Sequence, residues 1–464
     1  MKSFKSTIIY LISSLIEKGM AFLLIPIYTH YLSTADYGIL TIVQSMIAIL
    51  IIFFTLSLNG AASRYHFDGK WLYRKIHYGN LFLSVTIISI IVGVLFYFSS
   101  DIIFKLIGNV PKYPYIYFIF IITYGSAIFG IYQLKLQMEQ RAVEYGINNI
   151  LKFLIASLIA IYLVVYLHKK ADGILLGQSV AFIIFLLYIA IRLKKENIKF
   201  NLYKKFLKRN IKYSINLVPH NIAGILMQFL DRFFISNMIN LSHAGVYALG
   251  GQISSILGVV ASAINNATVP VVLKAYKEKN YKLLIDLANI SIVVLVIGAI
   301  ILSLFSSEII TIISPKSYEK ASIVLSTLSF YFVIQMYYFM TSSVLFYEEK
   351  ATKFVPVATV LSLIFNFIFN YFFIKELGML GAAIATLLSL ILVNYIVIFI
   401  ADKYIKVGFE HLKIHFYIIV GFVAGNSNIF FKVLIYEKIL ILLLVMSFFY
   451  LFEKNNLLLK ELKV

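Results

Sequence analysis

The octapeptide MEQRAVEY (residues 138–145) follows a long apolar segment, and the similar octapeptide YEEKATKF (residues 347–354) follows another apolar segment. Further pairs keep the same order at a nearly constant offset, with Asn59 recurring as Asn266 and Leu32-Ser33 with Gly38 recurring as Leu241-Ser242 with Gly245. The common order indicates that the chain consists of two related halves. Membrane proteins built from two repeats commonly open alternately to the two sides of the bilayer, so transport is the first hypothesis.

The composition indicates whether these halves are surrounded by water or by lipid. The chain is 61% hydrophobic and 13% charged, with a mean hydropathy of +0.91. This apolar share exceeds that of a soluble domain, so lipid must surround much of the protein. The absence of cysteine excludes disulfides and thiolate metal sites, and the histidines show no metal-binding spacing. We expect no metal and no cofactor.

Apolar segments of about 20 residues, long enough to cross a bilayer as helices, recur along the whole chain. None shows the alternation of a barrel strand. The pattern predicts an all-α polytopic membrane protein with about fourteen spans. We place them at residues 7–30, 39–58, 78–98, 114–135, 146–167, 173–191, 213–237, 246–268, 284–305, 321–346, 354–374, 378–400, 414–431 and 439–452.

The spans group into two six-helix lobes followed by a C-terminal helix pair. Because six is even, both lobes enter the membrane in the same direction, and a parallel pseudo-two-fold axis would relate them. The expected boundaries give an N-terminal lobe (1–193), a basic linker (194–212), a C-terminal lobe (213–403), and a final pair with a basic tail (404–464). The linker is either an amphipathic helix on the inner leaflet or an ordinary basic tether.

The distribution of basic residues predicts the orientation. Most of the 41 Lys and Arg fall on one side of the predicted topology, which the inside-positive rule assigns to the cytoplasm. Both termini are then cytoplasmic. The net charge of +20 needs no nucleic acid, because basic loops beside anionic membrane lipids explain it.

Three motifs resemble a known family. They are Gly19-x6-Pro26-x-Tyr28-x3-Leu32-Ser33-x2-Asp36-Tyr37-Gly38, Asp231-Arg232-Phe233-Phe234-Ile235 followed by Gly245-Val246-Tyr247, and Gly378-Met379-x-Gly381-Ala382-Ala383. They resemble signatures of bacterial lipid-linked oligosaccharide flippases, the polysaccharide-transport branch of the multidrug/oligosaccharidyl-lipid/polysaccharide exporter superfamily. The resemblance covers essentially the whole chain. The extra C-terminal helix pair resembles the lipid II flippases, which leaves the sub-branch open.

This resemblance implies a particular cargo and pathway. A family member would carry undecaprenyl-pyrophosphate-linked oligosaccharide repeat units, of the O-antigen or capsule type, from the inner to the outer leaflet of the bacterial cytoplasmic membrane. It would do so by alternating access, for surface polysaccharide biosynthesis. A polysaccharide polymerase and chain-length proteins are its possible partners.

Ionisable residues within or beside the spans are the candidate site, because a charge in the bilayer usually faces a partner or a wet cavity. Basic side chains are the usual ligands of phosphate. Each has an alternative: Arg64 and Lys152 snorkel to headgroups, Lys18 pairs with a carboxylate such as Asp231, and Asp231 and Arg232 belong to a structural network. The candidate diphosphate ligands are Lys18, Arg64, Lys152 and Arg232, and the candidate ion-coupling carboxylates are Glu17 and Asp231.

Neutral polar residues form a second set. They could line a cavity for sugar, or they could make hydrogen bonds between helices. The set comprises Asn59, Asn216, Asn221, Gln228, Asn266, Asn366 and Asn370.

Charged residues at the inner ends of two related spans are a further group. Salt bridges at an inner gate or solvated helix ends would explain them equally. They are Glu139, Arg141 and Glu144 in the first half, and Glu348, Glu349 and Lys350 in the second.

Two other functions compete with the flippase. An ion-coupled multidrug exporter of the same superfamily would favour carboxylates in its cavity, since its substrates are cationic. A polysaccharide polymerase would carry a large outer loop for its chemistry, whereas the outer loops predicted here are short. No Walker A motif is present, so ATP hydrolysis is not built in. We expect a transporter and not an enzyme.

Overall fold

The computed structural model describes residues 2–68, 71–107, 110–351, 354–427 and 433–453, and every regular element in these ranges is helical. Contacts divide the chain into two compact units, Met1–Gly245 and Val246–Val464. The N-terminal unit adds the linker and the seventh predicted span to the first six spans. Packing therefore groups the helices differently from the repeat that the sequence predicts.

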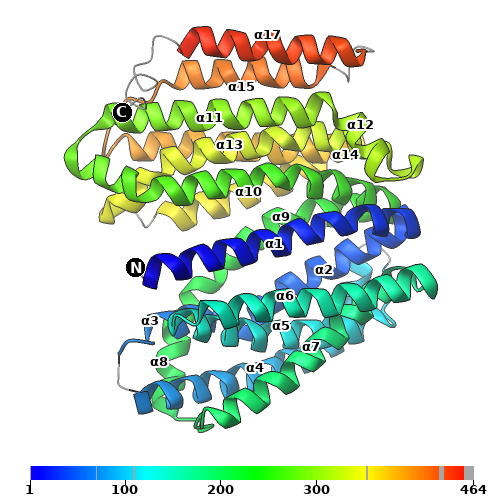
Figure 1. The fold of residues 1–464 in the computed structure, drawn as a ribbon, viewed down its shortest axis with the longest axis vertical. Coiled ribbons are helices and arrows are strands. Elements are labelled where there is room, and N and C mark those ends of the chain that lie inside the picture. The colour runs from blue at the N-terminus through cyan, green and yellow to red at the C-terminus, as the bar shows by residue number, and fades with distance from the viewer. Residues whose placement is uncertain (1, 69–70, 108–109, 352–353, 428–432, 454–464) are drawn as a thin grey trace. The chain divides into compact units, whose positions relative to one another are not determined.

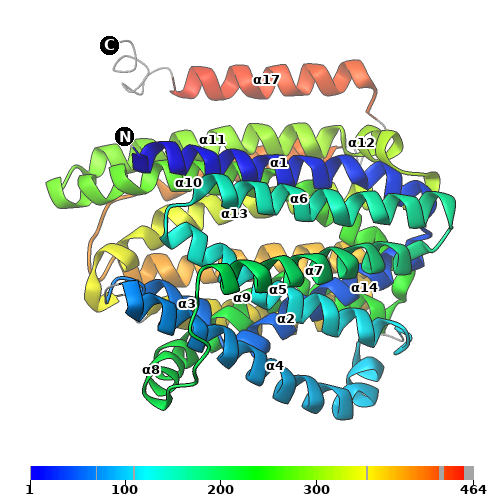
Figure 2. The same cartoon turned by 60° about the horizontal axis from the view of Figure 1, so that its bottom comes forward.

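The long helices of unit 1 alternate in direction along the chain, and α1 lies beside α6 in both views (Figure 1, Figure 2). A π-helical turn, η1 (Tyr162–Tyr166), extends α6, and a 3-10 turn, η2 (Ile215–Leu217), links α8 to α9. The α-helices are α1 (Lys2–Tyr31), α2 (Thr34–Thr55), α3 (Leu58–Arg64), α4 (Trp71–Leu106), α5 (Tyr115–Met138), α6 (Ala142–Ile161), α7 (Lys170–Lys195), α8 (Lys204–Ser214) and α9 (Val218–Met238).

Unit 2 forms around α11 and α13, whose buried aliphatic side chains build its core. The C-terminal helices α15 and α17 pack on α11. Two 3-10 turns, η3 (Lys316–Tyr318) and η4 (Glu349–Ala351), flank α13. The α-helices are α10 (Leu241–Glu278), which begins in unit 1, α11 (Tyr281–Leu304), α12 (Ser306–Ile313), α13 (Ala321–Tyr347), α14 (Phe354–Ala401), α15 (His411–Gly425) and α17 (Ile435–Glu453).

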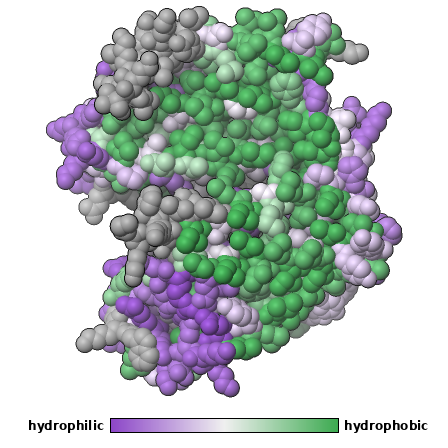
Figure 3. All heavy atoms as spheres, in the orientation of Figure 1, coloured by the Kyte–Doolittle hydropathy of each residue, from purple (hydrophilic) through white to green (hydrophobic). Residues whose placement is uncertain are grey.

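Each predicted span coincides with a helix over most of its described residues. Nine of these helices are long and apolar enough to cross a membrane. Helices α1, α9, α15 and α17 occupy four more predicted positions, and α14 contains two spans joined at a kink. The chain is thus an all-α, multi-pass membrane protein, as predicted. Figure 3 shows hydrophobic side chains over the middle of the helices of each unit and hydrophilic side chains at their ends.

The kink in α14 explains the small residues of the third motif. Gly378 has φ 58° and ψ −133°, a backbone conformation that favours glycine. After this turn the second half of α14 packs so closely on the first that a Cβ on Gly381 would lie 2.0 Å from the carbonyl oxygen of Phe373. The motif therefore allows two spans to cross at close range.

Two glycines of the other motifs meet where α2 and α10 begin. A Cβ on Gly38 would lie 2.0 Å from the carbonyl oxygen of Leu241, and a Cβ on Gly245 would lie 2.0 Å from that of Thr34. Nearby, Ser33 and Asp36 form a capping box that satisfies free N–H groups at the start of α2. The motif residues thus set the start and the close packing of these helices.

The linker is held against α4. A Cβ on Gly79 would lie 1.9 Å from the carbonyl oxygen of Lys199, so only glycine permits this approach. The Asn80 amide donates to the carbonyl oxygens of Asn201 (3.3 Å) and Tyr203 (3.4 Å). The linker is thus a docked segment and not a free tether, and it contains the helix α8 that the sequence predicts.

Candidate functional site

An ion pair joins α1 and α6 near the middle of both helices. The Lys152 Nζ lies 3.5 Å from an Oε of Glu17, and the two side chains are 20% and 33% exposed. The same ammonium lies 4.7 Å from the ring centroid of Phe129 on α5 and 5.7 Å from that of Phe182 on α7. A carboxylate and two aromatic faces therefore compensate the Lys152 charge. This arrangement favours a structural role over snorkelling for Lys152.

Lys18 has a different environment. Helix α1 has 30 residues, about 45 Å at 1.5 Å per residue, and Lys18 lies near its middle. Its side chain is exposed, and it forms no ion pair with a carboxylate of the described residues. The alternative pairing with Asp231 is thus not found in this structure. A cation held at this depth costs about 3 kcal/mol or more unless something compensates it.

The adjacent residues Asp231 and Arg232 on α9 face different surroundings. Asp231 is 4% exposed, whereas Arg232 is half-buried, with its guanidinium carbon 4.9 Å from the ring centroid of Phe229. Both side chains have interaction partners. Successive helical residues point about 100° apart, which explains the two environments.

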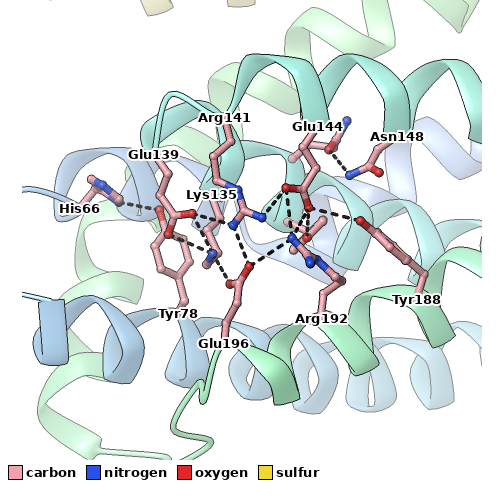
Figure 4. Close-up of polar contacts among 12 residues, drawn as sticks. His66, Tyr78, Lys135, Glu139, Arg141, Glu144, Asn148, Tyr188, Arg192 and Glu196 are labelled. Carbon is pink, nitrogen blue, oxygen red and sulfur yellow. Dashed lines mark hydrogen bonds and ion pairs between the residues drawn. The ribbon is translucent and has the colours of Figure 1, made fainter.

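A network of charges at the end of α5, the start of α6 and the end of α7 was only partly predicted (Figure 4). Lys135, with a side chain 3% exposed, lies 2.9 Å from Glu139 and 2.6 Å from Glu196. Arg141 lies 2.7 Å from Glu196 and also pairs with Glu144. The carboxylates are therefore shared between helices and are not solvated helix ends.

The second half of the network centres on Glu144. Arg192 of α7 lies 2.9 Å from this carboxylate, and the Tyr132 and Tyr188 hydroxyls donate to it at 2.9 Å and 3.2 Å. Beside it, the Gln133 amide donates to Asn149 at 2.9 Å and to the carbonyl oxygen of Tyr145 at 3.0 Å. Three cations balance three carboxylates, so the network binds helices together and presents no net charge to an anionic cargo.

Pairing decides the protonation of this network. Burial alone would raise the pKa of Glu196, but hydrogen bonds from Arg141 and Lys135 outweigh it and hold that pKa below its ordinary value. Burial alone would lower the pKa of the Arg141 guanidinium, but hydrogen bonds to Glu196 and Glu144 raise it. Both groups stay charged at neutral pH.

Two of the neutral candidates hold the kink of α14 together. Asn366 and Asn370 are buried, at 1% and 0% exposure. The Asn366 amide donates to Thr386 across the kink at 3.1 Å, and the Asn370 amide donates to the Asn366 side chain at 3.1 Å. These contacts favour the alternative of interhelical hydrogen bonding over a sugar-lined cavity.

Asn221 supports the break between α2 and α3. Its amide donates to the Ser57 hydroxyl at 2.9 Å. Leu56 and Ser57 have φ values of 43° and 56°, so the predicted second span ends at Thr55 and a short helix follows. This break is where the structure departs from the predicted span 39–58.

The remaining candidates lie apart from these clusters. Arg64 ends α3, is 61% exposed, and approaches Asp68 at 3.9 Å. Asn59 and Asn266 are exposed, and the Asn216 amide donates to the carbonyl oxygen of Lys212 at 3.4 Å. The backbone of Gln228 lies in α9, and its side chain lies outside the described set. The structure thus brings together Glu17 with Lys152 and Asn366 with Asn370.

Sequence reasoning missed three members of the network, Lys135, Arg192 and Glu196. The signal was present, because Lys135–Glu139 and Arg192–Glu196 are both i,i+4 pairs of opposite charge at the ends of neighbouring spans. Two such pairs on adjacent helices were sufficient grounds to predict one shared cluster of charged side chains.

The fold defines a multi-pass helical membrane protein. The chain belongs to the polysaccharide biosynthesis protein family, whose model matches residues 3–276. The MatE family also matches, over residues 218–372. These matches confirm the predicted superfamily of flippases and exporters, whose members are transporters and not enzymes.

Relatives and solved structures agree with this assignment. The chain is 25% identical over 392 residues to Lsg locus putative protein 1 of Haemophilus influenzae, covering 78% of this chain and 89% of the relative. It is 24% identical over 457 residues to the probable low-salt glycan biosynthesis flippase Agl15 of Haloferax volcanii, covering 96% and 93%. The lipid II flippase MurJ in an inward closed conformation shares its fold, with a TM-score of 0.70, 15% identity, and coverage of 97% and 99%.

Proposed function

We propose that this protein is a flippase for undecaprenyl-pyrophosphate-linked oligosaccharide repeat units. It moves them by alternating access from the inner to the outer leaflet of a bacterial cytoplasmic membrane, for surface polysaccharide biosynthesis. Both termini then lie in the cytoplasm, and a polysaccharide polymerase and chain-length proteins act downstream. The glycan flippase among its relatives supports this cargo class.

One observation carries the proposal: Lys18 and Lys152 both lie near the middle of their helices in unit 1, and of these two only Lys152 has a carboxylate partner among the described residues. Lys152 pairs with Glu17, whereas the exposed Lys18 pairs with no described carboxylate. A lipid diphosphate would supply the missing anionic charge through charge-assisted hydrogen bonds. In this mechanism Lys18 holds the diphosphate, Arg232 receives it farther along the path, and Arg64 meets it at the inner surface.

The test uses purified protein in liposomes and a fluorescent prenyl-diphosphate saccharide. Loss of one charge-assisted bond costs about 1.5–3 kcal/mol, so Lys18→Gln should slow translocation roughly 10- to 100-fold. Lys18→Arg should retain most of the activity because it keeps the charge. Lys105→Gln, which removes an exposed lysine at the end of α4, is the matched control. Full activity of Lys18→Gln would refute this role.

A multidrug exporter is the second candidate, and the MatE match over residues 218–372 favours it. An exporter of cations would lose transport on neutralisation of Asp231 and would gain from neutralisation of Lys18. Deletion in the host would then lower drug tolerance and leave surface polysaccharide intact. A lipid II flippase would instead accept the peptide-bearing cargo in the liposome assay.

A further inference from the structure

Helix α8 has two opposite faces. Lys204, Lys205, Lys208 and Lys212 are exposed, and at 100° per residue they fall within one third of the helix circumference. We call these four residues the lysine stripe. Asn210 and Ser214 lie on the opposite side and are buried, at 1% and 0% exposure. The helix therefore docks by one face and carries the lysine stripe on the other.

The docked face is firmly fixed to α3 and α4. The Arg209 guanidinium carbon lies 4.0 Å from the ring centroid of Tyr65, and a guanidinium nitrogen lies 3.4 Å from Asp68. Phe206 packs on Tyr73 with their ring centroids 5.2 Å apart. Because these contacts occupy the apolar side of α8, this helix does not need to insert that side into lipid. The predicted interfacial helix thus rests on protein.

The lysine stripe has no anionic partner within the described part of the chain, since none of its four residues forms an ion pair there. Large apolar side chains border it and are also exposed: Phe200, Leu202 and Tyr203 before it, and Tyr213 and Ile215 after it. Figure 3 shows that hydrophilic side chains gather at one end of unit 1 beside its hydrophobic belt. Basic residues flanked by aromatic and aliphatic ones, at the edge of such a belt, suit a bilayer headgroup layer.

We propose that the lysine stripe of α8 binds the headgroups of acidic phospholipids in the leaflet at that end of unit 1. The bound lipid fixes the depth of α3 and α4, to which α8 is docked. Each lysine near an anionic surface strengthens the association by about fivefold. This site takes membrane phospholipid and is independent of the cargo, so its test is separate from the translocation test.

The single tryptophan of the chain, Trp71, begins α4 and provides an intrinsic reporter at this end. The full chain is reconstituted in phosphatidylcholine vesicles containing equal fractions of either brominated phosphatidylglycerol or brominated phosphatidylcholine. We expect stronger quenching of Trp71 by brominated phosphatidylglycerol. Replacing the lysine stripe by K204Q/K205Q/K208Q/K212Q should remove that preference, and added salt should weaken it in the native chain.

The matched control removes four exposed lysines that lie outside α8, as K105Q/K169Q/K316Q/K320Q, and should keep the preference. Circular dichroism and size-exclusion chromatography establish that both variants fold. Equal quenching by the two lipids in the native chain would overturn the proposal, as would a preference that survives loss of the stripe. Competition by inorganic pyrophosphate at constant ionic strength would also overturn it, by indicating a site for soluble anions.

Discussion

Gly38 and Gly245, which occupy corresponding positions in the two sequence repeats, pack against each other's helix starts in a reciprocal way. Each lacks room for a Cβ because a main-chain oxygen of the other helix start fills that space. Reciprocal contacts are what a two-fold relation between repeats predicts. This relationship supports the proposed duplication with an observation independent of the sequence pattern.

Substitution of either glycine should destabilise the protein. Gly38→Ala places a methyl group on the Leu241 carbonyl, and overpacking of this kind costs about 1–3 kcal/mol. Thermal unfolding in detergent measures the effect. Gly130→Ala is the matched control, since a Cβ at Gly130 meets nothing within 4 Å. Equal stability of the two variants would show that α2 and α10 are free to separate.

Loss of Glu17 should cost more than loss of both members of its pair. Glu17→Gln leaves the Lys152 ammonium without its carboxylate and should destabilise the protein by about 1–3 kcal/mol. The double variant Glu17→Gln/Lys152→Met removes the unpaired charge and should recover much of that loss. A double-mutant cycle on unfolding temperatures checks the coupling, and strict additivity would contradict it.

Removal of Lys135 should destabilise the ends of α5, α6 and α7 that carry the charge network. Lys135→Met leaves Glu139 and Glu196 close together without the buried cation between them, and breaking such a pair costs about 3–5 kcal/mol. Lys194→Met, at an exposed lysine of α7, is the control. Hydrogen exchange should show faster opening of α5–α7 in the first variant alone. Unchanged protection there would refute the role of the network.

The network should also make stability depend on pH. Because pairing lowers the pKa of Glu196 in the folded state, its contribution is complete above the ordinary glutamate pKa and is lost as pH falls through the lower folded value. The unfolding temperature should therefore drop as pH falls below ~4. Glu196→Gln should be less stable at neutral pH and show a flatter acid limb. An identical acid limb would assign the effect to other carboxylates.

Disruption of the Asn366–Thr386 hydrogen bond should lower the stability of the protein without changing the apparent KM for its cargo. Interhelical hydrogen bonds in membranes contribute about 0.6 kcal/mol on average. We therefore expect Asn366→Ala to lower the free energy of unfolding by a similar amount. Translocation of the prenyl-diphosphate saccharide should keep its apparent KM, since the side chain is buried in the kink. A raised KM with unchanged stability would instead support a cavity role.

The sequence predicts the spans well because the length of an apolar segment depends only on consecutive residues. Within a bilayer such a segment forms a helix whichever helices it packs against, since its backbone groups must bond internally. Partnerships depend on which helices become neighbours, and this information is not local. Glu17 and Lys152 illustrate the difference. As charged residues within apolar spans they stand out in the sequence, but only the packing of α1 on α6 shows that they pair with each other. The hydrogen bond from Asn221 to Ser57 likewise depends on the break at Leu56 and Ser57. The hydrophobicity of the segment does not predict this break.

The docked linker determines where the chain divides into compact units. Gly79 and Asn80 fasten the linker to α4, and α9 packs with the N-terminal unit, although the sequence pattern predicts that α9 belongs to the second repeat. The predicted repeat and the segment that packs as one unit therefore have different borders. A split of the gene after α7 would separate the two predicted repeats, whereas a split after Gly245 would separate the two compact units.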